Sequence, residues 1–152
     1  SDMYDLIDKK LENKYHRYEV SNYSITSYES RHNLTYWKNN EYYGFGLGAA
    51  GYIDNIRYTN TRNLSKYISD NYEKQNELLT KEDKIKYEFI LGLRLTSGLN
   101  KDNFNKKYGI NINEIEVIKE LINKGLLIDD KINIYVPKKY FYVLNDILVN
   151  FV

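Results

Sequence analysis

The chain has 152 residues, 42% of them apolar, which is enough for one ordinary domain or two small ones with a packed core. Its 22 basic and 21 acidic residues leave a net charge of +1, whereas a dedicated nucleic-acid-binding protein carries a clear basic excess. The absence of cysteine excludes disulfides and fits a cytoplasmic location, and no apolar run is long enough to span a membrane.

The first half of the chain predicts short helices and strands. Residues 5–14 place apolar side chains on one side of a short helix, and residues 15–21 alternate as a short strand does. Residues 22–40 show no period, so we expect an irregular loop there. Residues 42–58 predict a β-hairpin that turns at Asp54 and Asn55, and residues 63–72 predict a helix.

The second half has clearer signals. Thr80 and Asp83 have the spacing of a capping box at the start of a helix over 80–96, and Gly109 is placed to end a second helix over 102–108. A third helix, over 113–124, is expected to begin at Asn113 as its cap. A hairpin of 126–128 with 132–136 follows, and a last helix is expected to begin near Pro137. The expected buried faces are Ile85, Phe89, Ile90 and Leu93, then Ile115, Ile118 and Ile122, then Tyr140, Leu144, Ile147, Leu148 and Phe151.

These elements predict an α+β fold with two parts. The composition changes near 73–79, so we predict one domain over 1–72 and a second, mainly helical domain over 73–152. Three helices, a hairpin and a helix is the order of a winged-helix module. Its third helix carries Glu114, Glu116 and Glu120, which makes it a poor reader of DNA phosphates and favours a structural or protein-binding role.

Residues 46–51 spell G-x-G-x-x-G, the pattern of a dinucleotide-binding loop. That function requires a buried strand before the loop and a helix after it. Here the preceding residues 39–43 make a poor buried strand, and residues 52–56 look extended. The glycines at 44, 46, 48 and 51, together with Ala49 and Ala50, instead predict a flat ribbon with few side chains. Such a ribbon serves either tight packing in a sheet or the floor of a cofactor site.

The chain has two histidines and no recognisable set of catalytic residues. His16 lies in the predicted strand beside Arg17, and we interpret it as structural or exposed. His32 lies among polar residues of the expected loop, where functional side chains are common. A single histidine without a second ligand at metal spacing is a weak metal candidate, so we predict no metal site.

Five separated motifs resemble one known family in the same order along the chain. They are YEVSNYS (18–24), ESRHNLTYW (29–37), EYYGFGLGAAGYI (41–53), RYTN (57–60) and EFILGLRLTSGL (88–99), and LINKGLL (121–127) follows. Together they resemble the C-terminal region of the HemW branch of the radical S-adenosylmethionine proteins, which are similar to oxygen-independent coproporphyrinogen III oxidases. The SRHN residues favour the heme-chaperone branch over the oxidases.

The resemblance implies that residues 1–72 form the end of a radical S-adenosylmethionine β/α barrel and that residues 73–152 form the family's winged-helix-like C-terminal domain. In the intact protein it implies a [4Fe-4S] cluster and S-adenosylmethionine, whose cleavage gives a radical, and it implies heme as a further ligand. The cluster's cysteine motif is absent from this chain, so we expect the chain alone to be inactive. The resemblance assigns cofactor contacts to His32, Asn33, Gly46, Gly48, Ala49 and Ala50.

The implied partners are the N-terminal radical S-adenosylmethionine domain, heme or porphyrin, and proteins that accept heme. We expect no nucleic-acid partner, and we expect an unpaired strand edge to promote self-association. The alternative is an autonomous protein-interaction module with a winged-helix half.

Overall fold

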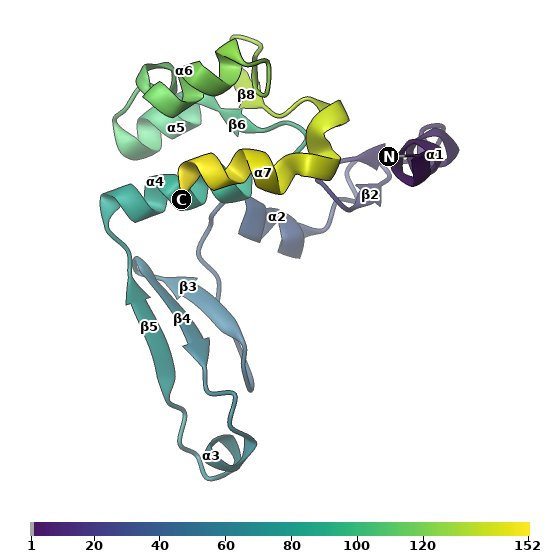
Figure 1. Cartoon of the computed structure of the whole chain (residues 1–152). Helices are drawn as coiled ribbons and strands as arrows, with labels where there is room; N and C mark the ends of the chain where they lie inside the picture. The colour runs from purple at the N-terminus through teal and green to yellow at the C-terminus, as the bar shows by residue number, and fades with distance from the viewer. Residues whose placement is uncertain (1) are drawn as a thin grey trace.

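A computed structural model of the chain describes residues 2–152. Residue 1 of the predicted first domain lies outside the described residues. The fold mixes helices with small antiparallel sheets, which confirms the mixed fold class. The helix α4 (Lys81–Gly92) and the C-terminus lie in a helical body, a three-stranded sheet projects away from it, and the helix α1 (Asp2–Leu11) lies apart on another side (Figure 1). Within residues 2–152, no helix has the length and apolar character needed to cross a membrane.

The N-terminal region is more regular than its sequence suggested. The predicted first helix is α1 (Asp2–Leu11), and the predicted strand shrinks to β1 (His16–Arg17), which pairs with β2 (Tyr23–Ser24). Residues 22–40, expected to be irregular, contain β2 and the helix α2 (Arg31–Trp37), so that prediction was wrong. Helix α2 escapes a periodicity search because it has only seven residues and buries none of them fully.

The projecting sheet contains the predicted hairpin. Strand β3 (Ala50–Ile53) pairs with β4 (Ile56–Asn60), and the turn residues Asp54 and Asn55 have φ of 49° and 67°, as a tight hairpin turn requires. Strand β5 (Lys74–Leu78) completes the antiparallel order β3-β4-β5. Helix α3 (Leu64–Ile68), a shorter form of the predicted helix, lies at the far end of the sheet (Figure 1).

The second half contains every predicted element, in the order helix, strand, two helices, hairpin and helix. A short strand beside α5 pairs with the hairpin, giving an antiparallel sheet of order β6-β8-β7. The elements are α4 (Lys81–Gly92), β6 (Leu99–Asn100), α5 (Lys101–Tyr108), η1 (Ile112–Glu114), α6 (Glu116–Asn123), β7 (Ile128–Asp129), β8 (Asn133–Tyr135), η2 (Lys138–Val143), α7 (Leu144–Leu148) and η3 (Val149–Phe151).

Local capping signals fix most helix ends in this half. Thr80 and Asp83 form the predicted capping box, and Gly109 closes α5 in the left-handed conformation with φ of 67°. The predicted cap Asn113 was wrong. Asn111 caps the short helix η1 instead, and the Asn113 amide donates to Asp129 of β7 at 2.5 Å.

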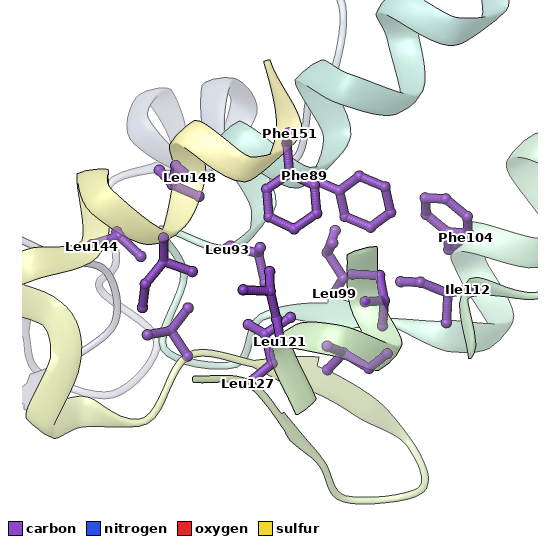
Figure 2. Packing of buried hydrophobic residues seen from close by; sticks show 14 of the residues in the cluster. Phe89, Leu93, Leu99, Phe104, Ile112, Leu121, Leu127, Leu144, Leu148 and Phe151 are labelled. Atoms are coloured by element: carbon purple, nitrogen blue, oxygen red, sulfur yellow. The ribbon is translucent and has the colours of Figure 1, made fainter. Parts of the chain in front are cut away.

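The hydrophobic core lies between α4, α5, α6 and the C-terminal helices (Figure 2). Phe89 is central because its ring lies 5.2 Å from the Phe104 ring and 4.8 Å from the Phe151 ring, measured between centroids. Leu93 and Ile118 are fully buried, as predicted. Partly buried residues at the margin of this core include Ile85, Ile90, Ile115, Ile122 and Tyr140, all of which were expected on the buried faces.

Candidate functional site

The predicted site residues lie on two neighbouring segments. His32 and Asn33 lie on α2, and the four others lie in the segment that leads into β3, which we call the glycine ribbon (residues 42–51). The ribbon is not flat, as predicted, but reverses direction. Gly46 and Gly48 have φ of +98° and +69°, and the reversal lets Tyr42 pair with Tyr52 of β3. Glycine is required at both turning points because other residues rarely adopt these angles.

The glycines of the ribbon fall into two kinds. A Cβ atom at Gly44 would overlap the carbonyl of Ala50, and one at Gly51 would overlap the ring of Tyr58, so these two glycines serve internal packing. No atom lies within 4 Å of a Cβ built at Gly46, and only the Arg62 side chain approaches one at Gly48. The backbone at the turn is therefore open to a ligand, whereas the backbone at its base is closed.

Residues of the RYTN motif hold the ribbon in place. The Tyr58 hydroxyl accepts the Gly44 N–H at 2.9 Å, and the Asn60 side-chain amide donates to the carbonyls of Gly44 and Gly46 at 3.1 and 2.9 Å. The backbone N–H of Gly48 donates to Thr61 at 2.9 Å. The sequence analysis included this motif in the resemblance but gave it no role. The signal was available, because a polar residue near a glycine-rich turn often supplies its missing hydrogen bonds.

Large apolar side chains line the outer side of the ribbon. Tyr43, Phe45 and Leu47 alternate with the glycines, and 68%, 85% and 41% of their surfaces are exposed. The rings of Tyr43 and Phe45 lie 5.9 Å apart. The ribbon is therefore not uniformly poor in side chains, because it also exposes apolar surface between its glycines.

His32 lies on a helix rather than in the expected irregular loop. Ser30 caps α2 by accepting the Asn33 N–H, and the exposed His32 ring meets the Tyr36 ring edge-on, with 4.6 Å between centroids. Asn33 donates its side-chain amide to the Tyr18 hydroxyl at 3.4 Å. The His16 Nε2 atom, by contrast, lies 2.9 Å from a carboxylate oxygen of Glu29, which agrees with a structural role.

An aromatic contact joins the two segments. The Tyr36 ring of α2 lies 4.3 Å from the Tyr42 ring at the start of the ribbon, between centroids. Beside this contact lies a cavity of about 250 Å³ whose lining combines aromatic side chains with asparagines and Arg57. Burial raises the pKa of the Tyr42 hydroxyl, and the nearby Arg57 guanidinium partly opposes that rise. The lining residues are Asn33, Tyr36, Trp37, Asn39, Asn40, Tyr42, Arg57 and Leu91.

A larger cavity lies elsewhere. It measures about 680 Å³ and lies between α1 and η2, where Asp8, Arg17 and Lys138 line it. Asp8 pairs with Lys138 at 3.1 Å and with Arg17 at 3.8 Å, so these charges already satisfy one another. None of the predicted site residues lines it.

The residues present fit some of the implied groups and not others. A [4Fe-4S] cluster does not fit, because the chain has no cysteine to ligate it. Within residues 2–152, no cluster of three or more histidine, aspartate or glutamate residues could hold a free metal ion. A porphyrin iron needs only one axial side chain, which the exposed His32 imidazole can supply. The open backbone at Gly46 and Gly48 fits a ligand that approaches closely.

Comparison with known proteins gives concordant relatives. Residues 79–139 match the family model described as the HemN C-terminal domain. The chain is 40% identical over 157 residues to the "Heme chaperone HemW" of Lactococcus lactis, covering 99% of this chain and 41% of that protein. It is 38% identical over 143 residues to the "Heme chaperone HemW" of Bacillus subtilis, covering 89% of this chain and 38% of that protein. The chain thus spans about two fifths of the length of these curated relatives.

A solved structure shows the same fold at low identity. Its description reads "Coproporphyrinogen III oxidase (HemN) from Escherichia coli is a Radical SAM enzyme". The TM-score is 0.71 at 15% identity, and the match covers 99% of this chain and 40% of that one. At this identity the likeness establishes the shared fold alone.

Proposed function

Because the chain belongs to the HemW and HemN family and corresponds to its C-terminal region, we propose that it is the part of a heme chaperone that contributes one wall of the heme site. Relatives named as heme chaperones support the chaperone branch, which the SRHN residues also favour. The proposal extends to the partners: heme is the cargo, and another protein accepts it.

The observation that carries the proposal is the contact between Tyr36 and Tyr42. It brings α2, which carries His32, against Tyr42 at the start of the glycine ribbon, ten positions after His32 in the chain. His32 would donate its imidazole to the heme iron. Backbone groups of Gly46 and Gly48, with Ala49 and Ala50 beside them, would contact the porphyrin or S-adenosylmethionine, and Asn33 would offer its amide from α2.

Heme titration of the chain tests this assignment. We expect heme to give a shifted Soret absorption band with the wild-type chain and with His16→Ala, and no such shift with His32→Ala. His16 is the matched control because it is the other histidine and pairs with Glu29 away from the ribbon. An unchanged Soret shift in His32→Ala, or none in the wild type, would contradict the assignment.

Substitution within the ribbon tests its role in the longer protein. Gly48→Val places a branched side chain at a φ of +69°, and we expect it to weaken heme or S-adenosylmethionine binding. Gly109→Val makes the same change at a φ of +67° in the C-cap of α5 and serves as the control. Equal binding by both variants and the parent, with the fold retained, would argue against a ligand at the ribbon.

The finer architecture is also a proposal. The order α4-β6-α5-α6-β7-β8 supports a winged-helix-like C-terminal domain, and the acidic residues of α6 favour protein contact over DNA. We further propose that β3, β4 and β5 continue the sheet of a β/α barrel. All five residues of β5 are exposed, which supports pairing of this edge with another strand. Light scattering should then show that the chain self-associates, and a purely monomeric chain would argue against pairing at this strand edge.

A further inference from the structure

Arg57 of β4 occupies an unusual position at the inner end of the candidate surface. Its guanidinium lies over the Tyr52 ring at 4.6 Å and over the Tyr87 ring at 4.0 Å, measured to the centroids. One terminal nitrogen donates to the Asn39 side-chain oxygen at 2.6 Å. The buried Nε atom has no acceptor among the described residues. Such stacking fixes the plane of the guanidinium, which presents its donors in a defined direction.

The positive charge of Arg57 is not matched by a carboxylate. Among the ion pairs formed within residues 2–152, none includes Arg57. Three acidic side chains lie in the same region, and each has another partner; Glu41 accepts the Asp54 N–H at 2.8 Å. Glu88 accepts from Lys107 at 2.6 Å and from Tyr108 at 2.7 Å, and Glu77, opposite Arg57 in the β4–β5 pair, accepts from Tyr87 at 3.3 Å. A half-buried arginine without an ionic partner is costly unless an anion binds it.

Two cavities meet at this arginine. The cavity of about 250 Å³ beside α2 and a second of about 310 Å³ on the sheet face both have Arg57 and Tyr42 in their linings. Asn33 and Asn40 add amide groups to the first cavity. The first cavity therefore offers amide donors beside the guanidinium, as a carboxylate requires, whereas the second also contains the Glu77 carboxylate.

We propose that Arg57 binds a carboxylate group of the ligand, and, resting on the function proposed above, that this group is a propionate of the porphyrin. The surface has the layout that such a ligand needs. An imidazole lies at one end, the Tyr36 and Tyr42 rings follow, and the guanidinium lies at the other end. A porphyrin has its metal at the centre and its carboxylates at the rim, so one molecule can reach both ends.

The test compares heme with heme dimethyl ester, which lacks the carboxylates. Binding of each is measured by Soret titration for the wild type, for Arg57→Gln and for Lys106→Gln, an exposed cation of α5 that lines neither cavity. A hydrogen bond to a charged group predicts that Arg57→Gln weakens heme binding about tenfold or more. Esterification should weaken wild-type binding by a similar factor, and Arg57→Gln should then cause no further loss.

Contrary outcomes are equally clear. Equal heme affinities for Arg57→Gln and Lys106→Gln would overturn the proposal, while the Soret shift itself would still support heme binding. Equal losses for heme and its ester in Arg57→Gln would also overturn it, because they would indicate a general structural effect. Arg57→Lys keeps the positive charge but loses the planar fork of the guanidinium, so it should recover part of the affinity for heme and none for the ester. Such a recovery would show that the loss in Arg57→Gln does not come from misfolding.

If the wild type binds neither porphyrin, the proposed function fails and the carboxylate site is judged separately. Sodium propionate is then titrated against the ¹⁵N-labelled chain, with sodium chloride at equal ionic strength as control. A saturable shift of the Arg57 Nε–H resonance specific to propionate supports a site for another carboxylate ligand. No specific shift overturns the site.

Discussion

Asn60 is the residue whose removal tests most sharply how the glycine ribbon is held. Its side-chain amide donates to the carbonyls of Gly44 and Gly46, and each such hydrogen bond contributes about 0.5–1.5 kcal/mol. Its own side-chain oxygen is buried without a donor, so the Asn60→Ala change also removes a group that costs about 1 kcal/mol to bury. The net effect on the ribbon is therefore about 1 kcal/mol. Asn60→Asp puts oxygen in place of the donor facing two carbonyls and should cost at least about 2 kcal/mol.

Native-state hydrogen exchange measures this local effect. The Gly48 N–H, bonded to the Thr61 carbonyl at 2.9 Å, reports on opening of the ribbon. We expect its protection to fall about fivefold in Asn60→Ala and about thirtyfold in Asn60→Asp. The amide of Leu93, in the core of the other half, should keep its protection in both variants. Unchanged Gly48 protection, or a smaller loss in Asn60→Asp than in Asn60→Ala, would refute this account of the ribbon.

Three further predictions concern the helical half. Phe89→Ala removes a central ring from the core and should lower the free energy of unfolding by about 3–5 kcal/mol in urea titration; a loss below about 1 kcal/mol would contradict the packing described. The Lys101 ammonium, 2.7 Å away, holds the pKa of Asp129 below its ordinary value. The wild type should therefore be more stable than Asp129→Asn above about pH 4, and this difference in the free energy of unfolding should vanish as the pH falls through the lowered pKa. A difference that does not depend on pH would contradict this account. Gly98→Ala adds a Cβ that overlaps a backbone carbonyl of β8, whereas Gly109→Ala meets open space at a similar φ, so Gly98→Ala should lower the melting temperature more.

Elements defined by local chemistry could be predicted from the sequence. The turn at Asp54 and Asn55, the capping box of Thr80 and Asp83, and the left-handed Gly109 depend only on neighbouring residues. The same holds for the hairpin that ends in β8, where a short polar stretch separates two apolar runs.

Elements held by distant contacts could not be predicted. Strand β5 has the polar sequence KQNEL with every residue exposed, and only its pairing with β4 makes it a strand. Helix α2 combines a good cap, Ser30, with the strand-favouring Thr35, Tyr36 and Trp37, so local signals conflict there. The cap at Asn111 rather than Asn113 depends on the distant Asp129, which accepts the Asn113 amide.

The candidate site shows the same division. Sequence composition pointed to the ribbon, and the resemblance pointed to His32, but neither indicated that Tyr36 and Tyr42 join them. The distinction between closed Gly44 and open Gly46 also depends on the fold, because it rests on which strand returns beside the turn. Arg57 had no signal of its own, since its significance comes from having no ionic partner among the described residues in three dimensions.

The most direct test of the shared surface is NMR mapping of a diamagnetic porphyrin, zinc protoporphyrin, on the ¹⁵N-labelled chain. We expect amide shifts to concentrate on α2 around His32 and on the ribbon from Gly46 to Ala50, with few changes in the core around Phe89. Shifts confined to the helical half, or to the large cavity between α1 and η2, would contradict the central claim that α2 and the ribbon form one ligand-binding surface.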